Sequence, residues 1–542
     1  MSSVFIIVSA VILFLIAYFT YGSYLRKEWG LDDSRATPAH RMEDGIDYVP
    51  AEAPVLLGHH FASIAGAAPI IGPIAAATFG WIPVLLWIIV GGIFIGCVHD
   101  MGSIVTSIRN GGRSVGEVIN RTIGQTGKRL FSLFAWLTLI LVIAAFMSIV
   151  AETFSNTPSA ATSSLLFIVL AIIFGFFRNR SNFSLGTLTV VGVILLFFCV
   201  WFGLAFPLQL AESTWLIFAV VYIFVASITP VWVLLQPRDY LNSFLLYALL
   251  LGGFLGIVVG GPKLELAAIT SFETSTGYLF PILFVTVACG AISGFHSLVA
   301  SGTTAKQLNK ESDAQLIGFG GMLIESTLAV IALITAAVLT QGSYSELLAA
   351  DGPVSVFSRG IGQFVTNIGI SSEVGMNFAA LAVSAFALTT LDTATRLGRF
   401  IFQEYFMDDD VEDKTGGLLE NMYFATLVTV VFSAALAFTG HWNTIWPIFG
   451  SANQLLAALA LLSLATWLAQ KKIGNIKVVI PMVFMFAVTL SALAMLIYDN
   501  LFADGSLLLG VIGVLLFLLA VVLVQQSFRH LTGGAGTEDL SA

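Results

Sequence analysis

Long apolar runs separated by short polar loops extend along almost the whole chain. Hydropathy in windows of about 19 residues predicts fifteen membrane-spanning helices, each near the roughly 20 residues needed to cross a bilayer core. They lie near residues 3–25, 55–78, 81–107, 129–153, 161–178, 184–207, 214–235, 240–260, 280–302, 315–341, 372–394, 420–440, 444–468, 477–498 and 505–527. The pattern therefore predicts an all-α, polytopic membrane protein.

Composition points to the same class of protein. Of the 542 residues, 57% are hydrophobic and only 10% are charged, whereas about a quarter of the residues of a soluble protein are charged. A chain this poor in charge needs apolar surroundings, so a lipid bilayer is an expected partner. Nothing resembles a nucleic-acid-binding surface, and Cys97, Cys199 and Cys289 form no metal or disulfide pattern.

The cations indicate how the chain is oriented. If the N-terminus lies outside, all but two of the 23 Lys and Arg residues fall in loops on the inner side, the exceptions being Lys263 and Arg359. Cytoplasmic loops are enriched in cations in this way. We therefore expect a multi-pass protein of the inner (plasma) membrane, with its N-terminus outside and its C-terminus in the cytoplasm.

Two of the predicted spans carry residues that interrupt helices. Proline removes an amide donor and glycine loosens the backbone, and the freed polar groups must face protein or a wet cavity. The expected substrate-binding residues lie at these two interruptions. They are Gly66, Ala67, Pro69 and Gly72 in the span 55–78, and Ser227, Thr229 and Pro230 in the span 214–235.

The positions of the two interruptions predict an internal repeat. Residues 55–207 would form one set of five helices and residues 214–394 a second set, each beginning with an interrupted helix. Because five is odd, the second set would enter the membrane from the opposite side. Paired interruptions in inverted repeats point to a substrate site near the midplane, so we expect a leucine-transporter-like 5+5 core. Residues 1–54, a helix and a loop, and the C-terminal helices of 395–542 would be additions. The alternative is that glycine and proline are simply commoner in membrane helices.

Several longer phrases resemble a known family. They are DGIDYVPAEAPVLLGHHFASIAGAAPIIGP (44–73), GWIPVLLWIIVGGIFIGCVHD (80–100), RNGGRSVGEV (109–118), ITPVWVLLQPRDYLN (228–242), ACGAISGFHSLVASGTTAKQL (288–308), FALTTLDTATRLGRF (386–400) and WNTIWPIFGSANQLLAALALL (442–462). From about residue 44 to residue 470 the chain is similar to the carbon starvation protein A family of bacterial and archaeal membrane transporters. The resemblance implies uptake of peptides or pyruvate when preferred carbon runs out.

Polar residues inside the predicted spans are candidates for ion coupling, since such residues are costly in a bilayer. His59, His60 and His296 would couple transport to protons, because histidine changes charge near neutral pH. A sodium ion would instead use the hydroxyls of Ser297, Ser301 and Thr304 with carbonyls of the first interrupted helix. Each set also has a purely structural interpretation, as hydrogen-bond donors or packing residues. The coupling ion, H⁺ or Na⁺, stays open.

Further charged residues near the ends and middles of spans are gate candidates: His99, Asp100, Arg238, Asp239, Glu325, Asp392 and Arg396. Arg238 with Asp239, and Asp392 with Arg396, would form pairs that latch a gate or anchor helices. No cofactor is expected, and the solute would be a peptide or pyruvate.

Three other functions compete with coupled transport. Intramembrane histidines would also suit a membrane oxidoreductase with haem, or a metal site made of His59, His99, Asp100 and His296. The third is a starvation sensor or a channel. The sequence lacks a Walker motif, which argues against ATP-driven transport by this chain alone. A homo-oligomer or a small accessory subunit remains open.

Overall fold

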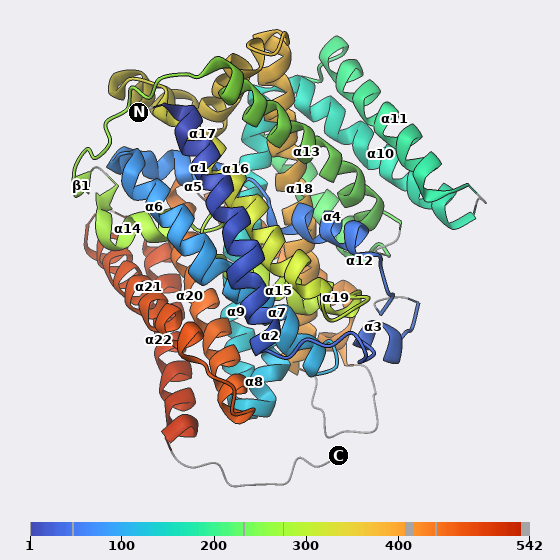
Figure 1. The fold of residues 1–542 in the computed structure, drawn as a ribbon, viewed down its shortest axis with the longest axis vertical. Helices are drawn as coiled ribbons and strands as arrows, with labels where there is room; N and C mark the ends of the chain where they lie inside the picture. The colour runs from blue at the N-terminus through green and yellow to red at the C-terminus, as the bar shows by residue number, and fades with distance from the viewer. Residues whose placement is uncertain are drawn as a thin grey trace.

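The computed structural model describes residues 2–532 except 46–47, 181–182, 231–232, 275, 407–416, 440–441 and 504. This part of the chain folds into a bundle of long helices (Figure 1). Its two strands, β1 (Glu273–Thr274) and β2 (Gly277–Tyr278), form a small antiparallel pair in one loop.

The first half of the chain supplies α1 (Ser3–Ala17), α2 (Ser23–Glu28), α3 (Pro38–Arg41), α4 (Ala53–Ile64), α5 (Ala68–Ala76), α6 (Trp81–Gly91), α7 (Cys97–Arg109), α8 (Val115–Ile123), α9 (Gln125–Asn156), α10 (Pro158–Arg180), α11 (Leu185–Ala205), α12 (Glu212–Ile228) and α13 (Leu235–Gly260). The second half supplies α14 (Leu279–Thr286), α15 (Gly294–Gly302), α16 (Gly321–Ala337), α17 (Gln341–Thr366), α18 (Ser372–Phe406), α19 (Met422–Thr439), α20 (Trp442–Gln470), α21 (Ile476–Phe502) and α22 (Leu507–Thr532). In Figure 1, α10 and α11 lie at one edge of the bundle, and α21 and α22 lie at another.

Within the described part, twelve helices are long and apolar enough to cross a membrane, and the bent pair α4–α5 would make thirteen. The protein is therefore a multi-pass membrane protein, but the predicted count of fifteen is not confirmed. Helices form at both remaining positions. The one near 214–235 is α12, which has only 17 residues, and the one near 280–302 is split into α14 and α15.

The interruption predicted in the span 55–78 is present. α4 ends at Ile64, α5 begins at Ala68, and the two helices are bent by 46°. The interruption predicted at Ser227–Pro230 takes a different form, since α12 ends at Ile228 and is not continued as a span. A break that the sequence did not predict separates α14 from α15 at residues 287–293.

The two broken helices, α4–α5 and α14–α15, pack against each other through small residues. A Cβ atom on Gly72 would lie 2.6 Å from the backbone oxygen of Thr286, and one on Gly290 would lie 3.7 Å from Cγ of Pro73. The side-chain oxygen of Asn453, from α20, supports the second break by accepting a hydrogen bond from Phe295 N at 2.9 Å. Small side chains therefore allow the two breaks to meet inside the bundle.

Basic residues gather at one end of the bundle, as the sequence predicts. Arg35 and Arg109 both contact Glu311, at 3.4 and 3.0 Å, and Lys477 contacts Glu28 at 2.8 Å. We call this the basic end. Lys263 forms a backbone bridge with Ser2 at the start of α1, which lies at the opposite end of the bundle (Figure 1).

The contact at Gly72 predicts a loss of stability in the variant Gly72→Ala. Its methyl group would collide with a backbone oxygen, and overpacking of this kind costs roughly 1–3 kcal/mol. The thermal midpoint of the detergent-solubilised protein should fall. The matched control is Gly252→Ala, whose nearest neighbour would lie at 3.7 Å and whose midpoint should not fall. Equal midpoints for the two variants would contradict the packing of the two breaks.

Candidate functional site

A set of buried ionisable residues, together with one threonine, lies where α4, α7, α15 and α16 meet. We call it the histidine–carboxylate centre, and it consists of His60, His99, Asp100, His296, Thr304 and Glu325. All six are buried, with exposed fractions of 0 or 1%. Because unpaired charges are very costly in such surroundings, the hydrogen bonds of each member decide which protonation states the centre can hold.

Asp100 organises the centre. Its Oδ1 lies 2.7 Å from His99 Nδ1, and its Oδ2 lies 2.8 Å from His296 Nδ1. An ionised carboxylate only accepts hydrogen bonds, so both imidazoles donate their Nδ1–H groups to Asp100. This fixes the tautomer of neutral His296 and leaves its Nε2 as an acceptor.

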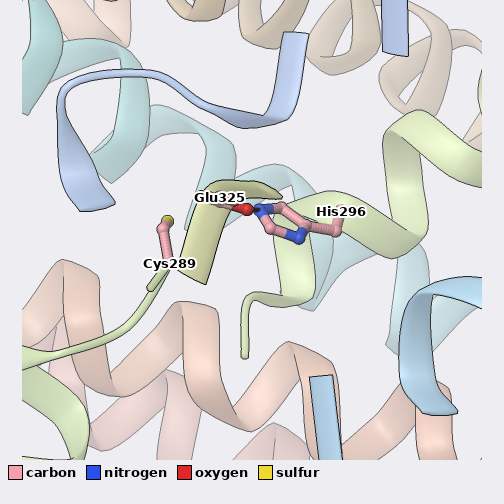
Figure 2. Close-up of side chains that lie close together, drawn as sticks. All are labelled: Cys289, His296 and Glu325. Carbon is pink, nitrogen blue, oxygen red and sulfur yellow. Dashed lines mark ion pairs between the residues drawn. The ribbon is translucent and has the colours of Figure 1, made fainter. Parts of the chain in front are cut away.

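The free side of His296 faces Glu325. His296 Nε2 lies 3.3 Å from Glu325 Oε2. Among the described residues, neither His296 Nε2 nor the two carboxylate oxygens of Glu325 have a hydrogen-bond partner. Figure 2 shows the two side chains directed toward each other, from α15 and α16. Neutral imidazole Nε2 and ionised carboxylate are both acceptors and would repel. The pair is satisfied only when one proton is placed between them.

Cys289 lies beside this pair (Figure 2). Donor atoms of Cys289, His296 and Glu325 all lie within 4.8 Å of one another, a spacing that a metal ion could also bridge. The thiol donates to Ser293 Oγ at 3.4 Å, whereas a zinc-bound cysteine is a thiolate. Of the metal set suggested by the sequence, the structure brings together His99, Asp100 and His296 but places His59 elsewhere.

The hydroxyl residues proposed for sodium point in different directions. Thr304 Oγ1 lies 2.8 Å from His60 Nδ1. Ser297 and Ser301 donate to the carbonyls of Gly294 and Ser297 in their own helix, and Ser301 Oγ also accepts from Val115 N. Each of the three hydroxyls therefore has a hydrogen-bond partner of its own.

A second buried group lies between α4, α12, α13 and α18. We call it the arginine cluster, consisting of His59, Tyr222, Arg238, Asp239 and Asp392. Arg238 donates to Tyr222 OH at 2.6 Å, to Asp239 Oδ1 at 3.0 Å and to Asp392. Tyr222 in turn donates to Asp392 Oδ2 at 2.7 Å, and His59 Nδ1 lies 3.5 Å from Asp239 Oδ2.

The structure thus confirms the contact of Arg238 with Asp239 and adds Asp392 as a third member. Arg396 belongs to α18, and its side chain reaches the end of α12. There it donates to the carbonyl of Ala226 at 2.9 Å and to that of Thr229. Arg399 donates to the carbonyl of Ser227 at 2.7 Å. The residues expected to bind solute at 227–230 are therefore contacted by arginines of α18.

The backbone between α4 and α5 is closed off from both ends of the bundle. Gly66, Ala67, Pro69 and Gly72 are all buried, and a Cβ on Gly66 would meet Thr390 Oγ1 of α18. Two cavities approach the break from opposite directions. One of about 200 Å³ reaches Ile71 and Ala380 from the end that carries Arg359, and one of about 240 Å³ reaches His59 from the end that carries Gln307.

Sequence reasoning missed Tyr222 of the arginine cluster and three residues near the two groups or the breaks, Cys289, Thr390 and Asn453. Tyr222 is one of few polar residues in an apolar helix, Thr390 is one of several threonines in its helix, and Asn453 is a lone amide in a long apolar run. Cys289 gave no signal beyond its position. Apart from the adjacent Arg238 and Asp239, the sequence did not show which of the ionisable residues meet.

The model of the family described as "Carbon starvation protein CstA" matches residues 2–351 and 345–492. The chain belongs to the carbon starvation protein CstA family. It is 34% identical to "Peptide transporter CstA" of Campylobacter jejuni, over 90% of this chain and 79% of that protein. It is 31% identical to "Peptide transporter CstA" of Bacillus subtilis, over 98% and 97%. It is also 31% identical to "Pyruvate/proton symporter BtsT" of Escherichia coli, over 92% and 82%.

Among solved structures, the chain resembles the Eremococcus coleocola manganese transporter in complex with an aromatic bis-isothiourea substituted compound. The TM-score is 0.50 over 90% of this chain and 99% of that one, at 12% sequence identity. At this identity the likeness concerns the fold alone. The CstA-family chain thus resembles the manganese transporter in its fold. The relatives of the chain are named transporters.

The cavity beside His59 predicts different accessibility for two neighbouring residues. In the variant His59→Cys, a membrane-impermeant thiol reagent should label the solubilised protein several times faster than it labels His60→Cys. His59 lines the cavity, whereas His60 is fully buried against Thr304. The unaltered protein, whose three cysteines are buried, supplies the background. Equal labelling of the two variants would contradict the closed position of the histidine–carboxylate centre.

Proposed function

We propose that this CstA-family chain is a secondary transporter that imports a small carboxylate-bearing solute, a peptide or pyruvate, across the inner membrane together with protons. The names of its relatives support transport of such solutes, and nothing about the centre requires an enzymatic reaction. The basic end of the bundle would face the cytoplasm, in line with the usual distribution of cations.

The proposal of proton coupling rests on the position of His296 opposite Glu325. Without a shared proton, two acceptors lie 3.3 Å apart in a fully buried site, which is unfavourable. With the proton, the repulsion between His296 and Glu325 is removed. The charge that remains is that of Asp100, which is compensated by its hydrogen bonds. The other titratable groups near Glu325 are Cys97, Asp100 and Cys289, and His60 and His99 lie near Asp100. The centre thus favours binding of one proton while it is occluded.

The break between α4 and α5 is the proposed position of the solute. At the start of α5, the amides of Ile70 and Ile71 donate to the carbonyl of Ala67 and Pro69 has no amide hydrogen, which leaves the amide of Ala68 at the break. The helix dipole favours a negative group at this end. A solute carboxylate would bind to this backbone, between the two cavities. Opening toward one cavity and then the other would give the solute access to each side in turn, and would expose the proton of the histidine–carboxylate centre to water.

The leucine-transporter-like arrangement, with residues 55–207 and 214–394 as inverted repeats, is part of this proposal. The bend between α4 and α5 supports it, because the first set then begins with a broken helix. The chain would retain α1 and the helices after residue 395 outside the core.

Sodium coupling is the second candidate for the driving ion. The hydroxyls that the sequence suggests for it are Ser297, Ser301 and Thr304, which the structure directs to separate partners. A haem or metal protein, a starvation sensor and a channel compete with coupled transport by either ion. An absorption spectrum and metal analysis of the purified protein test for haem and metal.

Uptake into proteoliposomes tests the proposal directly. Labelled pyruvate and a labelled dipeptide would each be offered with an inward proton gradient, an inward sodium gradient or neither. A gradient of one pH unit corresponds to about 1.4 kcal/mol. Transport of one proton with each solute molecule should therefore support up to about tenfold accumulation in such a gradient when no membrane potential is present. Accumulation under the sodium gradient alone would overturn proton coupling. Equilibration without accumulation under any gradient would indicate a channel.

Glu325→Gln should separate solute movement from proton coupling. The amide cannot release or take up a proton, so accumulation driven by a pH gradient should be lost, whereas exchange of labelled for unlabelled solute at equal pH should continue. Glu373→Gln is the matched control, since Glu373 is exposed at the start of α18, and it should behave like the unaltered protein. Undiminished proton-driven accumulation in Glu325→Gln would refute this role of the centre.

A further inference from the structure

The cavity of about 200 Å³ that approaches the α4–α5 break carries three charged residues in its described lining. They are Arg359 and Asp351 of α17 and Glu152 of α9. In Figure 1, α17 lies at the same end of the bundle as the N-terminus. If the basic end faces the cytoplasm, as proposed, this cavity opens to the outside. Because the cavity extends to Ile71 of α5, Arg359 is the cation that a carboxylate-bearing solute meets on its way to the break.

Arg359 already holds a carboxylate of its own chain. Its guanidinium lies 2.8 Å from Asp351 Oδ2, and the two side chains have exposed fractions of 59% and 42%. Ion pairs that are exposed to this extent contribute little to stability. A carboxylate from solution can therefore replace Asp351 with little loss. Asp351 occupies the position that the carboxylate of a solute would take.

The ion pair bridges a kink within α17. Gly352 has a φ of 74°, a conformation that other residues rarely adopt. Asp351 belongs to the segment before this kink, and Arg359 belongs to the segment after it. The first segment is also tied to α5, since the hydroxyl of Tyr344 donates to the carbonyl of Ile74 at 2.7 Å. Exchange of Asp351 for a solute would thus release a contact across the kink of a helix that is bonded to α5.

The start of the second segment favours a negative group in the same cavity. This segment runs from Pro353 to Thr366, and its first residues line the cavity. The N-terminal end of a helix carries partial positive charge. Ser358 also lines the cavity and is only 7% exposed, and its hydroxyl has no hydrogen-bond partner among the described residues. A serine hydroxyl can donate to a carboxylate.

Glu152 is the charge that opposes an incoming anion. It lies at the cavity wall on α9 and already takes part in an interaction of its own. Its carboxylate and that of Asp351 both repel a further carboxylate, which weakens binding. The cavity therefore suits a site of first contact, from which the solute moves on toward the break, and not a site of tight binding.

We propose that Arg359 captures the carboxylate of a solute that arrives from outside, in exchange for Asp351. Ser358 Oγ and the start of the second segment of α17 are the further partners of this carboxylate. The ligand class is a small organic carboxylate, and the site is separate from the one at the α4–α5 break. This inference rests on the proposed transport function and adds to it an outer site with a built-in competitor.

Uptake kinetics test the outer site. Initial rates for labelled pyruvate and labelled dialanine would be measured in proteoliposomes under an inward proton gradient, over a range of solute concentrations. Arg359→Gln should raise KM about two- to fivefold, the range that one exposed charge pair supports, and should leave the rate at saturation unchanged. Asp351→Asn should lower KM, because it weakens the resident competitor. A KM that is unchanged in Arg359→Gln, or that is not lowered in Asp351→Asn, would overturn the exchange.

Lys263→Gln is the matched control. Lys263 is exposed and is the other cation that the sequence predicts on the outer side, but it does not line the cavity. Its removal should leave KM unchanged. An equal rise of KM in Lys263→Gln and Arg359→Gln would assign the effect to general attraction of anions by outer charges and would remove the site.

Restoring the charge separates recognition from folding. The three native cysteines are buried, so Arg359→Cys offers an accessible thiol at an exposed position. A membrane-impermeant methanethiosulfonate that carries an ammonium group should bring KM back toward that of the unaltered protein. A reagent that carries a sulfonate should raise KM further. Because both reagents act on the same folded variant, the same response to both would contradict a carboxylate site at this position.

The outer site and the transport function can fail separately. Proton-driven accumulation in the unaltered protein, with an equal KM in Arg359→Gln, would remove the outer site and leave the proposed transport intact. Accumulation of neither solute by the unaltered protein under any gradient would remove the proposed transport function itself.

Discussion

The carboxylate of Asp100 is the group on which the rest of the site depends. It is fully buried, and an isolated carboxylate in such surroundings costs several kcal/mol unless donors compensate it. His99 and His296 supply those donors. In doing so, His296 is held in one tautomer with its second nitrogen directed at Glu325. A structural requirement, the compensation of one buried charge, thereby creates the position that we propose for the coupled proton.

The helix breaks explain how these groups come together in a membrane. α15 begins only after the break at 287–293, so His296 lies near the start of a short helix in the interior of the bundle, not in a continuous span. Small residues such as Gly72 and Gly290 let the two broken helices approach closely. The same packing places the end of α4 beside α18 and the arginine cluster. The positions that we propose for solute and proton are thus separate, and they are connected by the helices that form the two breaks.

Much of the helical framework could be predicted from the sequence, because apolar runs of the right length are a strong local signal. The break between Ile64 and Ala68 was also predictable, since the proline and glycine residues near it act on their own helix. The break at 287–293 was not, because it contains no proline and is stabilised by Asn453 from a distant helix. The ionisable residues were named individually, but the partners of Arg238 and His296 depend on which helices pack together, which hydropathy does not contain.

Proton linkage of solute binding tests the central claim most directly. Calorimetry of dialanine or pyruvate binding to the solubilised protein, repeated in buffers of different ionisation enthalpy, gives the number of protons taken up or released with the solute. If His296 and Glu325 share the coupled proton, binding at a pH where the pair is partly protonated should change the number of bound protons by a fraction of one up to about one. The change should be absent in Glu325→Gln. The same proton number in both proteins, or no proton change in the unaltered protein at any pH where it binds solute, would contradict the account.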